Sequence, residues 1–180
     1  QINKVFGAVS EAREVATGMP IGTGNAVEFQ RLLQRIVERF NAMPAGDVYI
    51  LPGGWCFKQR GGATETHLVL YVILKEVDAT TGKQRFRFTI CNTGEGLQFH
   101  PIEVDPETLK SRRNCCVIIP DIPSERVTDS AFWYALLRPL IFPSNDDSAT
   151  TAKMIYGKLL PFLNERPVQT NWMVDHMGMI

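Results

Sequence analysis

The sequence predicts an α+β fold: a central, mostly antiparallel sheet with a preceding helix and C-terminal helices. Residues 67–77 form an apolar run rich in β-branched side chains, which is typical of a strand buried in a sheet. Residues 85–91 alternate between apolar and polar side chains, as in a strand with one buried face. Helical spacing occurs at 25–40 and again beyond residue 129, so helices and strands are segregated along the chain.

The helix before the sheet has the clearest boundaries. Asn25 is a favourable N-cap, and Glu28 follows three residues later, as in a capping box. Apolar residues then recur on one face: Phe29, Leu32, Leu33, Ile36, Val37 and Phe40. Residues 43–46 end this helix, a short strand is expected over 47–51, and the Pro-Gly-Gly sequence at 52–54 predicts a turn.

Turn-forming residues separate the strands that follow. Residues 78–83 predict a hairpin connection, and residues 92–96 predict a turn or bulge. A short third strand is expected within 97–100. Another strand is expected over 115–119, where Pro120 ends it.

Two helices are predicted after the strands. Asp129 or Ser130 caps the first, which carries Phe132, Trp133, Leu136, Leu137 and Leu140 on one side. Pro139 is expected to kink or end this helix. A polar loop over 144–151 leads to the last helix, whose inward residues are Ile155, Tyr156, Leu159, Leu160 and Leu163.

Length and composition restrict the classes of protein to which the chain can belong. Its 180 residues are enough for one domain with its own core. The 19 basic and 19 acidic residues balance, which disfavours nucleic acid or an anionic membrane as a partner. No apolar run reaches the ~20 residues of a membrane span. Four cysteines without a CxxC pair are not a disulfide framework, so we expect an intracellular, cytoplasmic protein.

The two ends of the chain predict that it is a fragment of a longer protein. The chain begins at Gln1 and ends in the apolar sequence Met-Gly-Met-Ile, which follows an amphipathic segment at 169–177. Residues 1–24 show no clear period, so no element is predicted there. We therefore expect a single domain over 1–180 that contacts the rest of its parent chain.

His67 and Asn92 are the strongest candidates for catalytic residues. His67 opens the first long strand and Asn92 closes the next, so in a hairpin the two lie at the same edge of the sheet. A thiol nucleophile needs an imidazole to take its proton and a third group to orient that imidazole. The same two residues also suit a buried histidine at a strand end and an asparagine in a turn.

The segments THLVLYVI and FTICNTGEG resemble the His/Asn half of papain-like cysteine peptidases, calpain-type members included. In that family a histidine begins one core strand and an asparagine ends a later one. The resemblance covers about residues 51–100, and it departs from the family because Thr93 and Gly94 follow the asparagine instead of a tryptophan-containing signature. It implies that His67 is the base and Asn92 its orienting residue.

The nucleophile is harder to place. Papain-like enzymes carry a cysteine at a helix N-terminus upstream of the histidine, and no cysteine precedes Cys56 here. Cys56 is the best candidate within the chain, because it is predicted to lie in a glycine-flanked loop beside Lys58. Cys115 or Cys116 would take the role in a circularly permuted relative. The remaining alternatives are a nucleophile beyond Ile180 and a domain that has lost it.

The predicted loop over 53–62 is the candidate binding surface. Its Gly53 and Gly54 allow a mobile rim, and Trp55 is either a wall for an extended substrate or partner or a hydrophobic plug under the turn. The soft and imidazole ligands lack the paired spacing of a structural zinc site, so we expect no metal and no cofactor. Those ligands are His67, Cys91, His100, Cys115, Cys116 and His176.

Two functions follow. The first is a papain-like thiol hydrolase domain, or an inactive relic of one, that acts on a peptide or isopeptide bond. His67, Asn92 and Cys56 would form its catalytic site, and Trp55 would contact the substrate. The second is a non-catalytic module of a larger multidomain protein that binds a protein or peptide. Neither function requires nucleic acid or a membrane.

Overall fold

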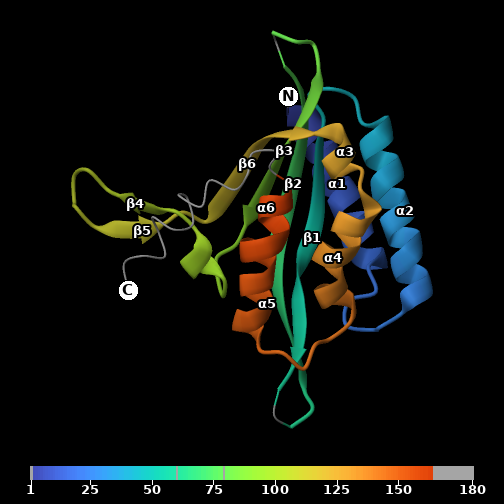
Figure 1. Cartoon of the computed structure of the whole chain (residues 1–180), viewed down its shortest axis with the longest axis vertical. Helices are drawn as coiled ribbons and strands as arrows, with labels where there is room; N and C mark the ends of the chain where they lie inside the picture. Colours follow the sequence, from blue (N-terminus) through green and yellow to red (C-terminus); the bar gives the residue numbers. More distant parts are fainter. Residues whose placement is uncertain (1, 60, 79, 164–180) are drawn as a thin grey trace.

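A four-stranded antiparallel sheet forms the centre of the molecule in the computed structural model, which describes residues 2–59, 61–78 and 80–163 (Figure 1). The strands lie in the order β1 (Val48–Lys58), β2 (Thr64–Val77), β3 (Gln84–Cys91) and β6 (Cys116–Pro123). Helices come before and after these strands in the chain, so the predicted α+β class is confirmed. The predicted amphipathic segment at 169–177 and His176 lie outside the described residues.

The remaining elements flank the sheet. A separate hairpin of β4 (Ile102–Val104) and β5 (Ser111–Arg113) projects away from it (Figure 1). A 3-10 turn, Leu97–Phe99, precedes this hairpin. The α-helices are α1 (Ile2–Gly18), α2 (Ala26–Ala42), α3 (Ser124–Val127), α4 (Ser130–Ile141), α5 (Ser148–Met154) and α6 (Leu160–Phe162). A π-helical turn, Ile155–Leu159, joins α5 to α6.

One face of the sheet carries the core. Side chains alternate along a strand, and every second residue is buried from Val69 to Lys75 in β2 and from Phe86 to Ile90 in β3. Helices α2 and α4 add their own apolar stripes to the same cluster. The opposite face is open at several positions: Leu68 is 59% exposed, Leu70 40% and Ile118 56%.

Strand β1 is longer than the sequence predicts. The prediction of a turn at Pro52–Gly54 is wrong, because these residues continue the strand. The strand continues to Lys58, and these residues pair with β2. Pro52 is tolerated because β1 is an edge strand. The two glycines allow close contact: a Cβ at Gly53 would lie 2.0 Å from the Tyr71 ring, and one at Gly54 would lie 1.9 Å from the His67 carbonyl oxygen. Gly53 and Gly54 therefore lie inside the sheet and do not form a mobile rim.

Other differences from the prediction are local. Residues 2–18 form α1, which packs against β1 although its sequence shows no strong apolar period. Residues 97–99 form the 3-10 turn where a strand was expected. Strand β6 continues past Pro120 to Pro123, and the last helical segment already begins at Ser148, where Asp147 caps it.

The predicted helix starts are close to those observed. Asn25 caps α2 by accepting a hydrogen bond from the Glu28 backbone N–H at 3.2 Å, and Asp129 caps α4 in the same way through Ala131. Pro139 lies within the last turn of α4 and does not break it. Within the described part of the chain, every helix is too short or too polar to cross a bilayer.

Candidate functional site

The strand ends bring His67 and Asn92 into contact. His67 lies near the start of β2, and Asn92 directly follows β3. Their strands are neighbours, and extending the β2–β3 register places Asn92 on the same face of the sheet as His67. The His67 Nε2 and Asn92 Oδ1 atoms are 3.0 Å apart, which is a hydrogen bond.

The hydrogen bonds of Asn92 define which way its amide points. Asn92 is buried, and its Oδ1 also accepts a bond from the Gly94 backbone N–H at 2.9 Å. Its Nδ2 donates to the Glu95 carbonyl oxygen at 2.7 Å and to the Tyr156 hydroxyl at 3.1 Å. The amide oxygen therefore faces His67, and the network assigns the shared proton to His67 Nε2. In the neutral imidazole this leaves the lone pair on Nδ1, where it can accept a proton.

Trp55 and Gly94 enclose the imidazole. The Trp55 ring lies across from His67 in the β1–β2 register, and the two ring centroids are 4.5 Å apart. The Trp55 indole N–H donates to Ser148 Oγ at the start of α5, and the side chain is fully buried. A Cβ at Gly94 would lie only 2.7 Å from His67 Cε1. Trp55 is therefore a packing partner of His67 in this structure, and the loop predicted to hold it is a strand.

Two residues that the sequence reasoning did not assign to the site complete its network. The Tyr156 hydroxyl is 2.8 Å from His100 Nε2, and His100 Nδ1 is 2.9 Å from the Asn114 carbonyl oxygen. A carbonyl oxygen only accepts, so His100 Nδ1 carries the proton and Nε2 accepts from Tyr156. Tyr156 stands in the apolar stripe of its helix, and His100 follows a turn, so neither showed a recognisable signal.

Both of these buried groups are held in the neutral form. Burial lowers the pKa of His100 below its ordinary value, partly offset by the hydrogen bond to Asn114. Burial also raises the pKa of Tyr156 to about 12, although the hydrogen bond with Asn92 acts in the opposite direction. The hydrogen-bond directions assigned above therefore hold at neutral pH.

Cys56 is not brought to His67. Side chains alternate along β1, so Cys56 points away from the face on which Trp55 meets His67. Its Sγ is 3.2 Å from Thr66 Oγ1 and 3.2 Å from the Leu140 carbonyl oxygen, and the residue is fully buried. Burial raises the pKa of this thiol, which is the opposite of the thiolate-favouring loop that the sequence predicted.

The other cysteines lie further along the sheet. Cys91 ends β3, and Cys116 begins β6 with Cys115 directly before it. Strand β3 separates β6 from the strand of His67, and neighbouring strands lie about 4.8 Å apart. No hydrogen bond joins any cysteine to His67 among the described residues.

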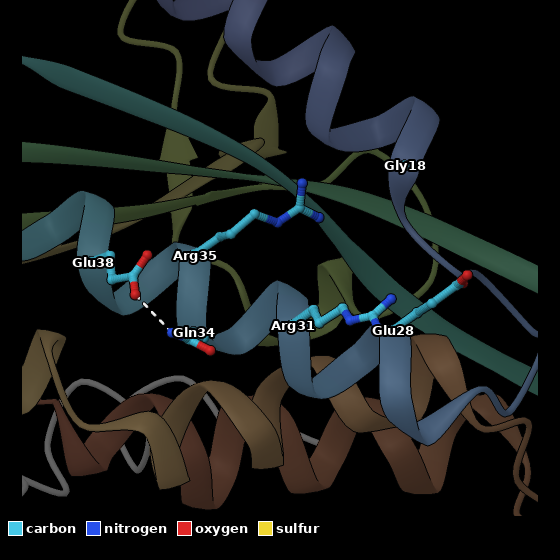
Figure 2. A pocket seen from close by; sticks show the side chains of 6 residues that line it. All are labelled: Gly18, Glu28, Arg31, Gln34, Arg35 and Glu38. Carbon is cyan, nitrogen blue, oxygen red and sulfur yellow. Dashed lines mark hydrogen bonds between the residues drawn. The ribbon is translucent and has the colours of Figure 1, made fainter.

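Metal clusters and hollows do not add to this site. Within residues 2–59, 61–78 and 80–163, no group of His, Cys, Asp and Glu is arranged to hold a metal ion. A shallow hollow of about 510 Å³ lies over α2. Figure 2 shows Arg31 extending beside Glu28, and Gln34 hydrogen-bonded to Glu38, among the residues that line it. Its lining contains none of the site residues, and its charges form the solvated face of an amphipathic helix.

The comparisons with known proteins add no relative. No family model, curated protein or solved structure matched the chain.

Proposed function

We propose that this chain provides the base and the orienting residue of a papain-like thiol hydrolase that acts on peptide or isopeptide bonds. His67 is the base and Asn92 is the orienting residue. The observation that carries the proposal is the 3.0 Å hydrogen bond between them, with an amide whose direction is defined by three further bonds. A nucleophile from outside the described residues completes the site; a chain that never receives one is an inactive relic.

The geometry suits each proton transfer of the reaction. His67 Nδ1 takes the proton of the incoming thiol, and the resulting imidazolium donates from Nε2 to Asn92 Oδ1. The thiolate attacks the carbonyl carbon, and collapse of the tetrahedral intermediate expels an amine that takes the proton from Nδ1. Water then repeats the cycle on the thioester and releases the acid and the thiol. Trp55 shields one side of the imidazole from solvent throughout.

A chemical complementation assay tests whether the base works. The chain is supplied with an excess of 2-mercaptoethanol and an activated peptide thioester, and acyl transfer to the small thiol is followed. We expect at least a tenfold acceleration that is lost in His67→Ala and reduced in Asn92→Ala, because a positioned general base contributes about 10²–10⁴-fold in a complete site. His176→Ala is the matched control. Equal rates for the native chain and His67→Ala would refute the proposal.

Electrophilic thiol probes test the origin of the nucleophile. Native chain and His67→Ala are treated with a probe panel at near-neutral pH, and labelled sites are found by peptide mapping. Slow labelling that His67→Ala does not change is expected, because no described cysteine contacts His67. Rapid labelling of Cys56 that depends on His67 would instead place the nucleophile within this chain.

A second candidate function is a non-catalytic module that binds a protein or peptide. The observation in its favour is the open face of the sheet, where Leu68, Leu70 and Ile118 are exposed. Such a module keeps its partner binding in His67→Ala and shows no thiol-dependent acyl transfer. The complementation assay therefore separates the two functions.

A further inference from the structure

Three thiols gather where β3 ends and β6 begins. The Cys91 and Cys116 sulfur atoms are 3.3 Å apart, and the Cys115 sulfur is 3.7 Å from that of Cys116. All three are free thiols. Cys56, by contrast, is buried on the other side of β2 with oxygen partners only. This thiol cluster (Cys91, Cys115 and Cys116) is separate from the His67 site.

The backbone register suits a bond between Cys91 and Cys116. These two residues lie directly opposite each other on antiparallel strands. The Asn92 N–H bonds to the Cys115 carbonyl oxygen at 2.8 Å, which makes the adjacent pair the hydrogen-bonded one. Cys91 and Cys116 are therefore a non-hydrogen-bonded pair, in which Cα atoms are about 4.5 Å apart and side chains approach most closely. That separation is within the range of about 4.4–6.8 Å that a disulfide requires.

The pair lies on the open face of the sheet. Side-chain alternation places Cys91 and Cys116 on the face opposite the core, and both are half-buried. Their neighbours on this face, Leu70 and Ile118, are exposed. A small oxidant in solvent can therefore reach the sulfur atoms without unfolding the sheet.

We propose that Cys91 and Cys116 form a reversible disulfide when the protein meets hydrogen peroxide. The Cys116 thiolate attacks the peroxide, so that an S–O bond forms, the O–O bond breaks and the leaving hydroxide takes a proton to become water. Cys91 then attacks the sulfenic acid sulfur, which forms the S–S bond, breaks the S–O bond and releases a second water. Two thiols lose two electrons and two protons, and one hydrogen peroxide is reduced to two waters.

The disulfide would close the segment that carries much of the site network. Cys91 and Cys116 are 25 positions apart, and the residues between them include Asn92, His100 and Asn114. Bond formation would tie the strand end that places Asn92 to the strand end that supplies the Cys115 carbonyl oxygen. The proposal concerns the thiols themselves and does not depend on whether His67 is catalytic.

Oxidation followed by mass spectrometry tests the proposal. The native chain is treated with hydrogen peroxide, blocked with N-ethylmaleimide and examined as intact protein and as peptides. We expect a loss of two hydrogens and reversal by dithiothreitol, with exposed Cys115 alkylated in the native protein and buried Cys56 alkylated only after unfolding in denaturant. The loop that the bond closes predicts a rise in Tm of about 5–10 °C. Since burial raises the pKa of the Cys116 thiol, the reaction should become faster as the pH rises.

Serine variants identify the bonded pair. Cys115 and Cys116 are adjacent, so Cys115→Ser is needed to assign the partner of Cys91. This variant should keep the disulfide and the rise in Tm. Cys91→Ser and Cys116→Ser should each abolish both, and Cys56→Ser is the control that changes neither. Bonds only between molecules, or stable oxidation of separate sulfurs, would overturn the proposal and are visible in the native chain. A Cys115→Ser variant that no longer forms the bond would also overturn it, because the linkage would then run through Cys115.

Discussion

Replacing Gly94 by alanine should break the contact on which the proposed function depends. A Cβ at this position would lie 2.7 Å from His67 Cε1, whereas carbon atoms in contact prefer about 3.5–4.0 Å. The imidazole must therefore move by about 1 Å. The backbone itself offers no obstacle, because Gly94 is not one of the glycines with positive φ.

That movement is enough to separate His67 from Asn92. A bond of 3.0 Å lengthened by about 1 Å exceeds hydrogen-bond distance, and the Trp55 ring at 4.5 Å restricts other movements of the imidazole. Loss of one such bond costs about 0.5–1.5 kcal/mol, to which crowding adds. Alanine recovers about 0.4–1 kcal/mol by restricting the unfolded chain. We expect a net loss of about 1–2 kcal/mol in the free energy of unfolding.

Two measurements report the effect of Gly94→Ala. Urea denaturation gives the free energy of unfolding, and nitrogen NMR of the imidazole reports which nitrogen of His67 carries the proton. The native chain should show the Nε2–H tautomer, and Gly94→Ala should show a mixture. Gly157→Ala is the matched control: a Cβ there meets nothing within 4 Å, so stability should not fall and the tautomer should not change. A Gly94→Ala protein that keeps both the native tautomer and the native stability would refute the geometry described above.

Three further predictions concern buried polar side chains, two of which belong to the network behind Asn92. Tyr156→Phe should lower the free energy of unfolding by about 1–3 kcal/mol in urea, because buried Asn92 and His100 each lose a partner. Tyr71→Phe should stay within about 0.5 kcal/mol of the native chain or stabilise it, because the buried Tyr71 hydroxyl approaches the Gly54 backbone but makes no hydrogen bond of good geometry among the described residues. Because the folded-state pKa of His100 is lowered, the unfolded chain binds its proton first as the pH falls from about 7 to 5. Stability should therefore fall over this range, by at most about 1.4 kcal/mol per pH unit from this residue, and His100→Gln should reduce the slope.

The sequence predicts the contact between His67 and Asn92, because the positions of two strand ends determine it. His67 and Asn92 stand at the ends of two consecutive strands, and a hairpin brings such ends together whatever the details of packing. Their approach could be inferred without a structure for this reason.

Pro52, Gly53 and Gly54 show why other features could not be predicted. Proline and glycine usually mark a turn, but here the glycines remove side chains that would collide with the Tyr71 ring and the His67 carbonyl oxygen. That reason appears only when the register between β1 and β2 is known. Helix α1 could not be predicted for a different reason: its less exposed residues include Ala8, Ala12 and Ala16, whose small side chains give only a weak apolar period.

The hydrogen bonds that link His67 to Asn114 all point in one direction, and this direction favours one tautomer of His67. His67 Nε2 donates to Asn92 Oδ1, Asn92 Nδ2 donates to the Tyr156 hydroxyl, Tyr156 donates to His100, and His100 donates to the Asn114 carbonyl oxygen. Every step after His67 points away from it, and bonds aligned in one direction polarise one another. The arrangement therefore favours the Nε2–H tautomer and leaves the Nδ1 lone pair for an incoming proton.

Asn92 is the residue at which this network meets the thiol cluster. Its side chain binds His67 and Tyr156, while its backbone N–H binds the carbonyl oxygen of Cys115 and its preceding neighbour is Cys91. A disulfide between Cys91 and Cys116 would restrain the backbone that aims this amide without touching the imidazole. The His67 tautomer measured before and after peroxide treatment therefore separates two cases. An unchanged tautomer means that oxidation only links the two strand ends, and a changed one means that oxidation alters His67 through Asn92.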